Sequence, residues 1–350
     1  MDKNAFHKIV NGKTIDIFKL SNSNGVSIEI INYGAKVVSI NVPDKDGIFK
    51  DIVLGYDNID DYLNLNLYYG ATIGRNANRI AKGKIEIEGN NYNFAINNGK
   101  NHLHGGLVGF NDVIWDAKFI DGKEQSLELT YLSVDGEENY PGNVTVKLIY
   151  TLTEDNELKI DYLATTDKTT VVNLTHHSYF NLAGEGNDSI ENHKIMINAD
   201  KFTPLDKTQI PTGEIRDVTN TPFDLREFTT IADKINLDDE QLKIGSGYDH
   251  NWMLKNDKNT IVLAASVYEP NSRRCMEVYT NQPGIQLYTG NFVCEEDGGK
   301  GDNKYKHRSA LCLETQHFPD APNHNNFISS ILKPNEKYNY TCIYKFSVKQ

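Results

Sequence analysis

The sequence comprises 350 residues with a formal net charge of −12 and an isoelectric point near 5.3. Because neither Lys nor Arg forms a long basic run, this balance argues against nucleic acid and anionic membranes as partners. The N-terminus lacks an uninterrupted apolar core of signal-peptide length, and no segment approaches the roughly 20 apolar residues of a membrane span. We therefore expect a soluble, cytoplasmic protein, a monomer or a homodimer, that binds a small molecule.

Alternating apolar and polar residues are the dominant pattern along the chain. A short helix is expected at residues 58–65, and a hairpin at residues 84–96 that turns at Gly89–Asn90. Antiparallel strands follow at residues 126–133, 144–152 and 158–164, with TEDNE as the turn between the last two. These segments predict an all-β protein.

The C-terminal half continues the pattern. A second short helix is expected at residues 229–236, and a strand at residues 338–348. No linker or internal repeat divides the chain, so we expect residues 1–350 to form one domain of large twisted antiparallel sheets packed face to face.

The four cysteines show no C-x-x-C pairing, which favours buried free thiols over a disulfide framework or a zinc site. They are Cys275, Cys294, Cys312 and Cys342.

Two adjacent histidines stand in VVNLTHHSYFNLAG, residues 171–184. Successive side chains of a strand point to opposite faces, so His176 and His177 cannot share a site if the strand continues through them. His176 has the parity of the apolar Leu174, whereas His177 has the parity of the polar Thr175. We therefore expect His177 to face the chemistry and His176 to be structural.

A carboxylate lies within an apolar-looking strand near the C-terminus. In CLETQ, Glu314 alternates with Leu313, so a charged group is placed where burial is expected. Such costly placements are commonest at functional sites, and Glu314 is the leading candidate for a proton acceptor. Asp249 is a second candidate acceptor, and Arg79 a candidate for holding a hydroxyl or balancing the carboxylates.

Several stretches combine amide or titratable side chains with aromatic residues, as sugar-binding sites do. They are GRNANRIAKG (74–83), NHLHGG (101–106), THHSYFNL (175–182), GYDHNW (247–252), QPGIQLYTGN (282–291) and CLETQHFPDAPNH (312–324).

Three other chemistries find less support. His102 and His104 stand in an H-x-H spacing that would place both on one strand face, as in metal-binding jelly rolls, but no carboxylate follows nearby. The glycines after them suit a close backbone approach to a ligand. A phosphate-binding loop and a G-x-S-x-G nucleophile are both missing. A histidine donor with a carboxylate acceptor remains, without a cofactor or metal.

Together, GATIGRNANRIAKG, LHGG, NLTHHSYFNLAG, YDHNW, QPGIQLYTGNF and CLETQHFPDAPN resemble the aldose 1-epimerase (galactose mutarotase) family, from about Asn32 to the C-terminus and in the same order. The resemblance implies a galactose mutarotase-like β-supersandwich that interconverts the α and β anomers of free hexoses such as galactose and glucose. It implies no metal and no cofactor. One departure is His176, where many members have Asn.

The resemblance also assigns roles to residues. His177 matches the general acid and Glu314 the general base, and we expect His104 to hydrogen-bond near the ring oxygen. The positions expected to bind substrate are Asn78, Arg79, His104, His177, Tyr179, Asp249 and Gln286.

Three alternatives stay open at this point. The chain could be an epimerase of hexose 6-phosphates, a non-catalytic carbohydrate-binding protein, or a metal-dependent jelly roll that uses His102 and His104.

Overall fold

The computed structural model describes all residues except 66, 123, 188, 257–259, 296–297 and 350. Within this part of the chain strands dominate, and the α-helices are α1 (Ile59–Asn64), α2 (Ile231–Ile235) and α3 (Glu240–Gly245). No helix in the described residues is long and apolar enough to cross a membrane. The predicted all-β antiparallel fold is confirmed.

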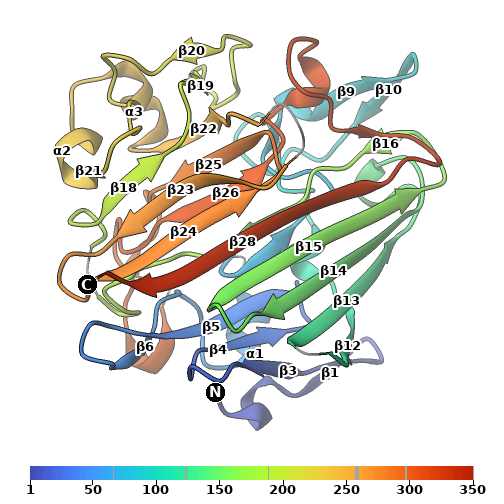
Figure 1. The fold of residues 1–350 in the computed structure, drawn as a ribbon. Helices are drawn as coiled ribbons and strands as arrows, with labels where there is room; N and C mark the ends of the chain where they lie inside the picture. Colours follow the sequence, from blue (N-terminus) through green and yellow to red (C-terminus); the bar gives the residue numbers. More distant parts are fainter. Residues whose placement is uncertain (66, 123, 188, 257–259, 296–297, 350) are drawn as a thin grey trace.

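The largest element is a nine-stranded antiparallel sheet that runs across the front of Figure 1. The C-terminal strand lies in its centre, so the last residues of the chain join strands from the middle and the end of the sequence. In spatial order the strands are β12 (Asp116–Ile120), β13 (Gln125–Ser133), β14 (Val144–Leu152), β15 (Glu157–Thr166), β28 (Tyr338–Val348), β24 (Arg274–Thr280), β23 (Val262–Tyr268), β18 (Lys194–Ile197) and β21 (Thr229–Thr230).

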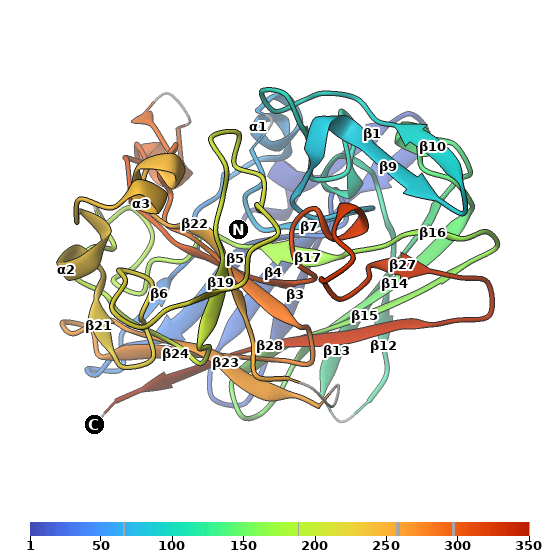
Figure 2. The same cartoon turned by 90° about the horizontal axis from the view of Figure 1, so that it is seen from above.

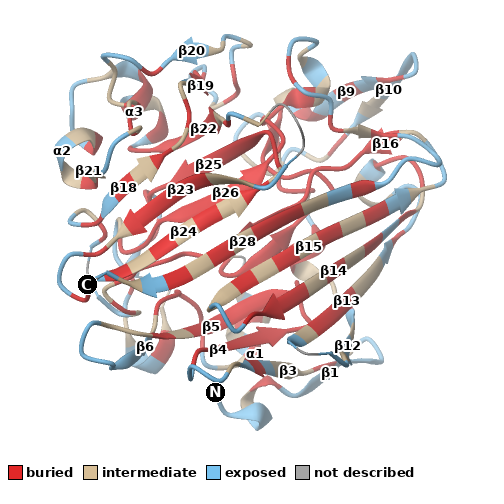
Figure 3. Ribbon diagram, viewed as in Figure 1, coloured by how far each residue is buried: buried red, intermediate tan, exposed pale blue. Residues whose placement is uncertain are grey.

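The alternation that predicted these strands reflects their burial, as Figure 3 shows along β14 and β15. In β15, Leu158, Ile160 and Tyr162 are buried, and the residues between them are partly exposed. Strands β14 and β28 have the predicted bounds, and β13 and β15 differ from the predictions by one or two residues.

A five-stranded and a four-stranded sheet lie against one face of the large sheet (Figures 1 and 2). The five-stranded sheet consists of β20 (Arg216–Asp217), β19 (Lys201–Thr203), β22 (Asp249–Met253), β25 (Gly284–Tyr288) and β26 (Cys312–Gln316). The four-stranded sheet consists of β3 (Ile17–Ser21), β4 (Ser27–Ile31), β5 (Lys36–Pro43) and β6 (Phe49–Asp51).

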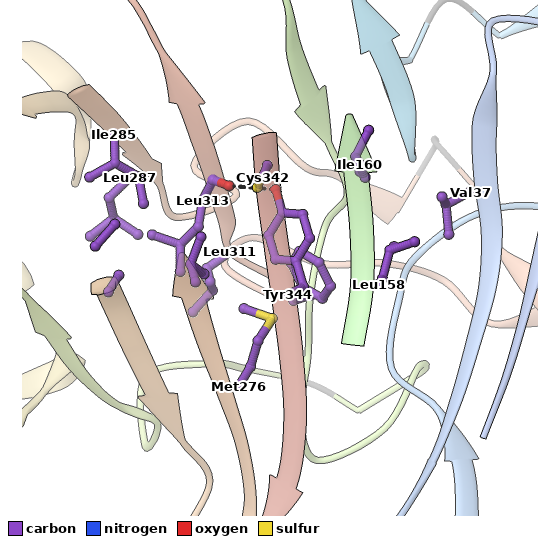
Figure 4. Close-up of a cluster of buried hydrophobic side chains, with 14 of the residues drawn as sticks. Val37, Leu158, Ile160, Met276, Ile285, Leu287, Leu311, Leu313, Cys342 and Tyr344 are labelled. Atoms are coloured by element: carbon purple, nitrogen blue, oxygen red, sulfur yellow. Dashed lines mark hydrogen bonds between the residues drawn. The ribbon is translucent and has the colours of Figure 1, made fainter. Parts of the chain in front are cut away.

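The main core fills the space between these layers (Figure 4). Leu313 and Ile285 project from the five-stranded sheet toward Met276 and Tyr344 of the large sheet, and the Tyr344 hydroxyl donates to the Leu313 carbonyl at 2.8 Å. Val37 contributes from the four-stranded sheet. Because one face of the five-stranded sheet is committed to this core, its opposite face is free to carry polar groups.

Five two-stranded pairs complete the described strands. They are β1 (Lys8–Val10) with β2 (Lys13–Ile15), β7 (Ala71–Ile73) with β17 (Thr175–His177), β8 (Arg79–Ile80) with β11 (His102–Leu103), β9 (Lys84–Ile87) with β10 (Asn90–Asn93), and β16 (Thr170–Val171) with β27 (Ile331–Leu332). Strand β17 also lies beside β26, which brings the two segments that carry His177 and Glu314 together.

The structure corrects some local predictions. The hairpin turns at Glu88–Gly89, one residue earlier than expected, because both residues take the positive φ angles that a tight hairpin turn requires. Helix α3 was not predicted, although the Asp239 side chain caps its N-terminus. Cys312 and Cys342 are buried free thiols, as predicted, but Cys275 is only partly buried and Cys294 is exposed.

Candidate active site

One cavity of about 350 Å³ opens over the polar face of the five-stranded sheet. It is lined by Leu67, Tyr68, Tyr69, Asn78, Arg79, Asn98, Leu103, His104, His177, Tyr179, Gln209, Asp249, Tyr288, Phe292, Val293 and Glu314. Seven of the residues expected from the sequence are therefore brought to one cavity, from segments that lie far apart in the chain.

The two adjacent histidines lie in different surroundings, as strand parity predicts. His177 lines the cavity. The centroid of the His176 ring instead lies 6.2 Å from that of Tyr150 and 5.8 Å from that of Tyr344, both residues of the large sheet. Its Nε2 is 2.7 Å from the Ser178 hydroxyl. The structure therefore makes His177 available to a ligand and places His176 in the core.

Glu314 is 2% exposed and faces His177, with Oε1 3.6 Å from the imidazole Nε2. It occupies a cross-strand row of polar residues, in which Asn251 of β22 is opposite Gln286 of β25 and Gln286 is opposite Glu314. The apolar Leu313 next to it points to the core, so the sheet itself holds Glu314 in the cavity.

Hydrogen bonds fix the Arg79 guanidinium on three sides. Its Nε donates to Asn98 Oδ1 at 3.1 Å, its Nη2 donates to Gln209 Oε1 at 2.6 Å, and both Nη atoms lie 3.4 Å from Asp249 Oδ2. Asp249 in turn accepts a hydrogen bond from Gln286 Nε2 at 2.8 Å. This connected array presents both donors and acceptors to the cavity.

His102 and His104 do not share a strand face, contrary to the metal-site alternative. Strand β11 ends at Leu103, and His104 takes a left-handed conformation with φ of 53°. His102 is turned away from the cavity, where its Nδ1 contacts the Ala95 carbonyl at 2.8 Å and its Nε2 contacts the Tyr140 hydroxyl at 2.6 Å. This satisfied histidine is structural.

His104 is set up as a hydrogen-bond donor. Its Nδ1 accepts the Asn78 backbone N–H at 3.2 Å, so the neutral ring carries its proton on Nε2. His104, His177 and Glu314 have ligand atoms within 4.8 Å of one another, but a ring protonated at Nε2 cannot offer that nitrogen to a metal. This donor set therefore suits a hydroxyl-bearing ligand better than a metal ion.

The glycines after His104 do not approach the cavity, contrary to expectation. Gly105 has a φ of 92°, and a Cβ there would lie 2.0 Å from the Gly74 carbonyl oxygen. The close approach is thus between Gly105 and the backbone of Gly74, and it fixes the loop that carries His104.

Burial shifts the pKa values of the facing pair in opposite directions. It lowers the pKa of His177 to about 4. Burial, followed by the Asp249 carboxylate, raises the pKa of Glu314 well above its usual range, while Arg79 opposes that rise. The pKa of His104 is lowered by burial and then by His177, so its ring is neutral. Perturbed groups that face each other in a cavity mark a functional site.

Gln286 is not among the residues that line the cavity, but its Nε2 donates a hydrogen bond to Asp249, which is. The sequence analysis missed several residues of the wall. Tyr288 and Phe292 lie within or beside quoted motifs, and Phe292 is 59% exposed at the rim, but Tyr68, Asn98 and Gln209 carried no motif signal.

The turn before β7 supplies a stability prediction. Gly70 has a φ of 66°, and a Cβ there would lie 1.9 Å from the Val37 carbonyl oxygen. We expect Gly70→Ala to lower the free energy of unfolding by about 3 kcal/mol, from backbone strain and overpacking together. Gly12→Ala is the matched control, because Gly12 also has a positive φ but no atom within 4 Å of its Cβ position. Equal losses in urea unfolding of the two variants would contradict the steric argument.

Comparisons with known proteins identify the family of this chain. Residues 16–345 match the family described as Aldose 1-epimerase. The chain is 43% identical over 335 residues to the galactose mutarotase of Bos taurus, with 96% of this chain and 95% of the relative covered. It is 34% identical over 341 residues to the aldose 1-epimerase of Escherichia coli (strain K12), with 96% of each covered.

Solved structures give the same result. The galactose 1-epimerase from Lactobacillus acidophilus superposes with a TM-score of 0.86 at 29% identity, over 98% of this chain and 97% of that one. An aldose epimerase homologue from C. elegans has a TM-score of 0.86 at 30% identity, over 95% and 99% of the two chains. The resemblance seen in the sequence is thus confirmed, and this protein belongs to the aldose 1-epimerase family of isomerases, which interconvert the anomers of aldoses.

Proposed function

We propose that this protein is a cofactor-independent aldose 1-epimerase that acts on free hexoses such as galactose and glucose. The observation that carries the proposal is the buried His177–Glu314 pair, 3.6 Å apart in a cavity of about 350 Å³. That volume lies within the usual range for small-ligand sites. The bovine relative is named galactose mutarotase, which supports galactose as a substrate.

Anomer exchange requires a proton donor and a proton acceptor at one carbon. The ring oxygen and the anomeric hydroxyl are both attached to C1, so an acid and a base 3.6 Å apart can reach the two oxygens of one sugar. His177 donates its proton to the ring oxygen while Glu314 removes the proton of the C1 hydroxyl. The C1–ring-oxygen bond breaks, and C1 becomes the aldehyde carbon.

Closure uses the same two groups in reverse. After rotation about C1–C2, the C5 hydroxyl attacks the other face of the aldehyde, returns its proton to His177, and C1 oxygen recovers a proton from Glu314. Asn78, Arg79 and Asp249 hold the remaining hydroxyls so that the open chain stays bound between the two steps. His104, protonated at Nε2, donates a hydrogen bond to the sugar near the ring oxygen.

One proton shared by the pair is the active form in this mechanism. Burial disfavours both charges, so the pair of His177 and Glu314 holds a single proton near neutral pH, and the proton must lie on His177 for ring opening to begin. Arg79 favours that arrangement because it lowers the pKa of Glu314.

The pH dependence of kcat/KM follows from the number of protons on the His177–Glu314 pair. In acid the pair takes up a second proton, so no carboxylate is left to act as the base. The lowered pKa of His177, about 4, places that loss well below neutrality. In alkali the pair loses its last proton and its acid, and the raised pKa of Glu314 delays this loss. We expect a bell-shaped profile with a plateau that includes pH 7, measured by polarimetry of galactose. A profile that rises through pH 6.5 like an exposed histidine would contradict the buried pair.

A neutral sugar suits the cavity better than a hexose 6-phosphate. Arg79 is the only Lys or Arg among the described residues that line the cavity, and its guanidinium is already bonded to Asp249, Asn98 and Gln209. A phosphate would therefore find no unpaired cation and would meet the carboxyl groups of Asp249 and Glu314.

Polarimetry tests the proposal against the alternatives. Freshly dissolved α-D-galactose, α-D-glucose and glucose 6-phosphate are followed in buffer with EDTA, with and without the protein. We expect faster decay to the same equilibrium rotation for the two free sugars and little effect on the phosphate. Loss of activity in EDTA would favour the metal alternative, and galactose binding without any rate effect would favour a carbohydrate-binding protein.

Three further aspects stay part of the proposal. We place the protein in the cytoplasm, as a monomer or a homodimer, with residues 1–350 as one domain. The free thiols of Cys275, Cys312 and Cys342 agree with a reducing compartment.

A further inference from the structure

Tyr68 lies against both histidines of the candidate active site, although no motif pointed to it. The centroids of its ring and of the His177 imidazole are 5.7 Å apart, and the angle of 26° between the planes makes this a stacked arrangement. It also meets the His104 ring edge to face at 4.7 Å. Tyr179 is stacked on His177 as well, at 5.0 Å and 23°. The imidazole of His177 thus has two nearly parallel tyrosine rings as neighbours.

The backbone holds Tyr68 in this position. Ala71 N–H donates to the Tyr68 carbonyl at 3.0 Å, which closes a turn, and Gly70 N–H donates to the His177 carbonyl at 3.1 Å. Ala71 is also the β7 partner of His177 in the β7–β17 pair. The turn that carries Tyr68 is therefore fixed directly to the strand residue that carries the imidazole.

The Tyr68 hydroxyl makes no hydrogen bond within the described part of the chain, so the ring is held by packing. Burial raises the pKa of Tyr68 to about 12, so its hydroxyl stays protonated and the side chain stays neutral near pH 7. It lines the cavity without adding a charge.

The groups around His177 offer a protonated ring little other support. Its Nδ1 has no hydrogen-bond partner among the described residues, and Glu314 is the carboxyl group at ion-pair distance. The titratable and charged groups that face or adjoin it are Tyr68, Arg79, His104, His176, Tyr179, Asp249, Tyr288 and Glu314.

We propose that Tyr68 is a positioning residue, which fixes the His177 imidazole and stabilises its protonated form through the aromatic face. The negative face of an aromatic ring attracts a cation, and the attraction is strongest where water is excluded. The ring shifts the shared proton from Glu314 toward His177, which is the arrangement from which ring opening begins. This inference rests on the proposed function for its effect on rate, but its effect on the proton does not require turnover.

Two substitutions separate the ring from the hydroxyl. Tyr68→Phe keeps the aromatic face and removes the hydroxyl, whereas Tyr68→Leu removes the face. The first measurement is the imidazole ¹⁵N chemical shift of His177 in the sugar-free protein, followed from pH 7 into the acid range and assigned by comparison with His177→Asn. We expect the imidazolium to form at the same pH in Tyr68→Phe as in the unaltered protein, and only at a lower pH in Tyr68→Leu. Tyr68→Met serves in place of Leu if circular dichroism shows that the Leu variant is unfolded.

The second measurement is galactose mutarotation by the same variants. We expect Tyr68→Leu to lower kcat about tenfold, which corresponds to about 1.4 kcal/mol, with KM changed less than threefold. Tyr68→Phe should stay within threefold in both constants.

Equal losses of kcat in Tyr68→Phe and Tyr68→Leu would overturn the inference, because the hydroxyl and not the aromatic face would then be the group that acts on His177. Unchanged ¹⁵N shifts in Tyr68→Leu would also overturn it. If the unaltered protein shows no mutarotation but the Leu variant still shifts the proton, the proposed function fails and the role of Tyr68 stands.

Discussion

Glu314→Gln is expected to reduce mutarotation of galactose to the buffer rate while the protein stays folded and binds the sugar. Glutamine has the same shape as glutamate but cannot take up the anomeric proton, so only the proton transfer is removed. The measurements are polarimetry for kcat and calorimetry for the galactose Kd, which should change less than threefold. Near-normal turnover would remove Glu314 from the role of base.

The same substitution has an expected effect on stability. The pKa of Glu314 is raised in the folded protein, so ionisation of this carboxyl opposes folding above its unfolded pKa. We expect the Gln variant to be at least as stable as the unaltered protein at pH 7, with the difference vanishing below about pH 4, where the carboxyl is neutral in both states.

Glu269→Gln is the matched control for a buried glutamate. Glu269 is also 2% exposed, but it lies outside the cavity wall and accepts backbone hydrogen bonds from Asn271 and Ser272. Because these bonds are lost or weakened in the amide, the control should lose stability and keep its kcat. A loss of kcat only in Glu314→Gln, together with a loss of stability only in Glu269→Gln, would show that position, not burial, makes Glu314 catalytic.

His177→Asn is expected to lower kcat by a factor of roughly 10² or more, the usual scale of general acid–base catalysis. Asparagine can still donate a hydrogen bond but cannot exchange a proton with the ring oxygen. The measurement is the rate of galactose mutarotation at saturating sugar. A loss below about fivefold would point to His104 or His176 as the acid.

His176→Asn separates the two adjacent histidines. His176 packs between rings of the large sheet and lies outside the cavity wall, so its replacement should cost stability through lost packing and leave kcat within a few-fold. Equal rate losses in the two variants would contradict the parity assignment.

Strand parity predicted the faces of His177 and Glu314 correctly because each residue stands on a strand whose other face packs into the core. Leu313 and His176 fill the core side, and a period of two then leaves their neighbours for the cavity. Parity failed for His102 and His104, since the strand ends at Leu103 and the next residue takes a left-handed conformation.

By itself, the sequence determined the long strands with regular alternation, the family and the two residues proposed to exchange protons, because these depend on local alternation and on contiguous motifs. Only the tertiary structure decided what surrounds those two residues. Tyr68, Asn98 and Gln209 reach the cavity from irregular segments whose order in space follows from sheet pairing and turns, not from any local pattern. The pKa directions of His177 and Glu314 arise in the same way, since desolvation depends on every layer of the chain that closes over a group.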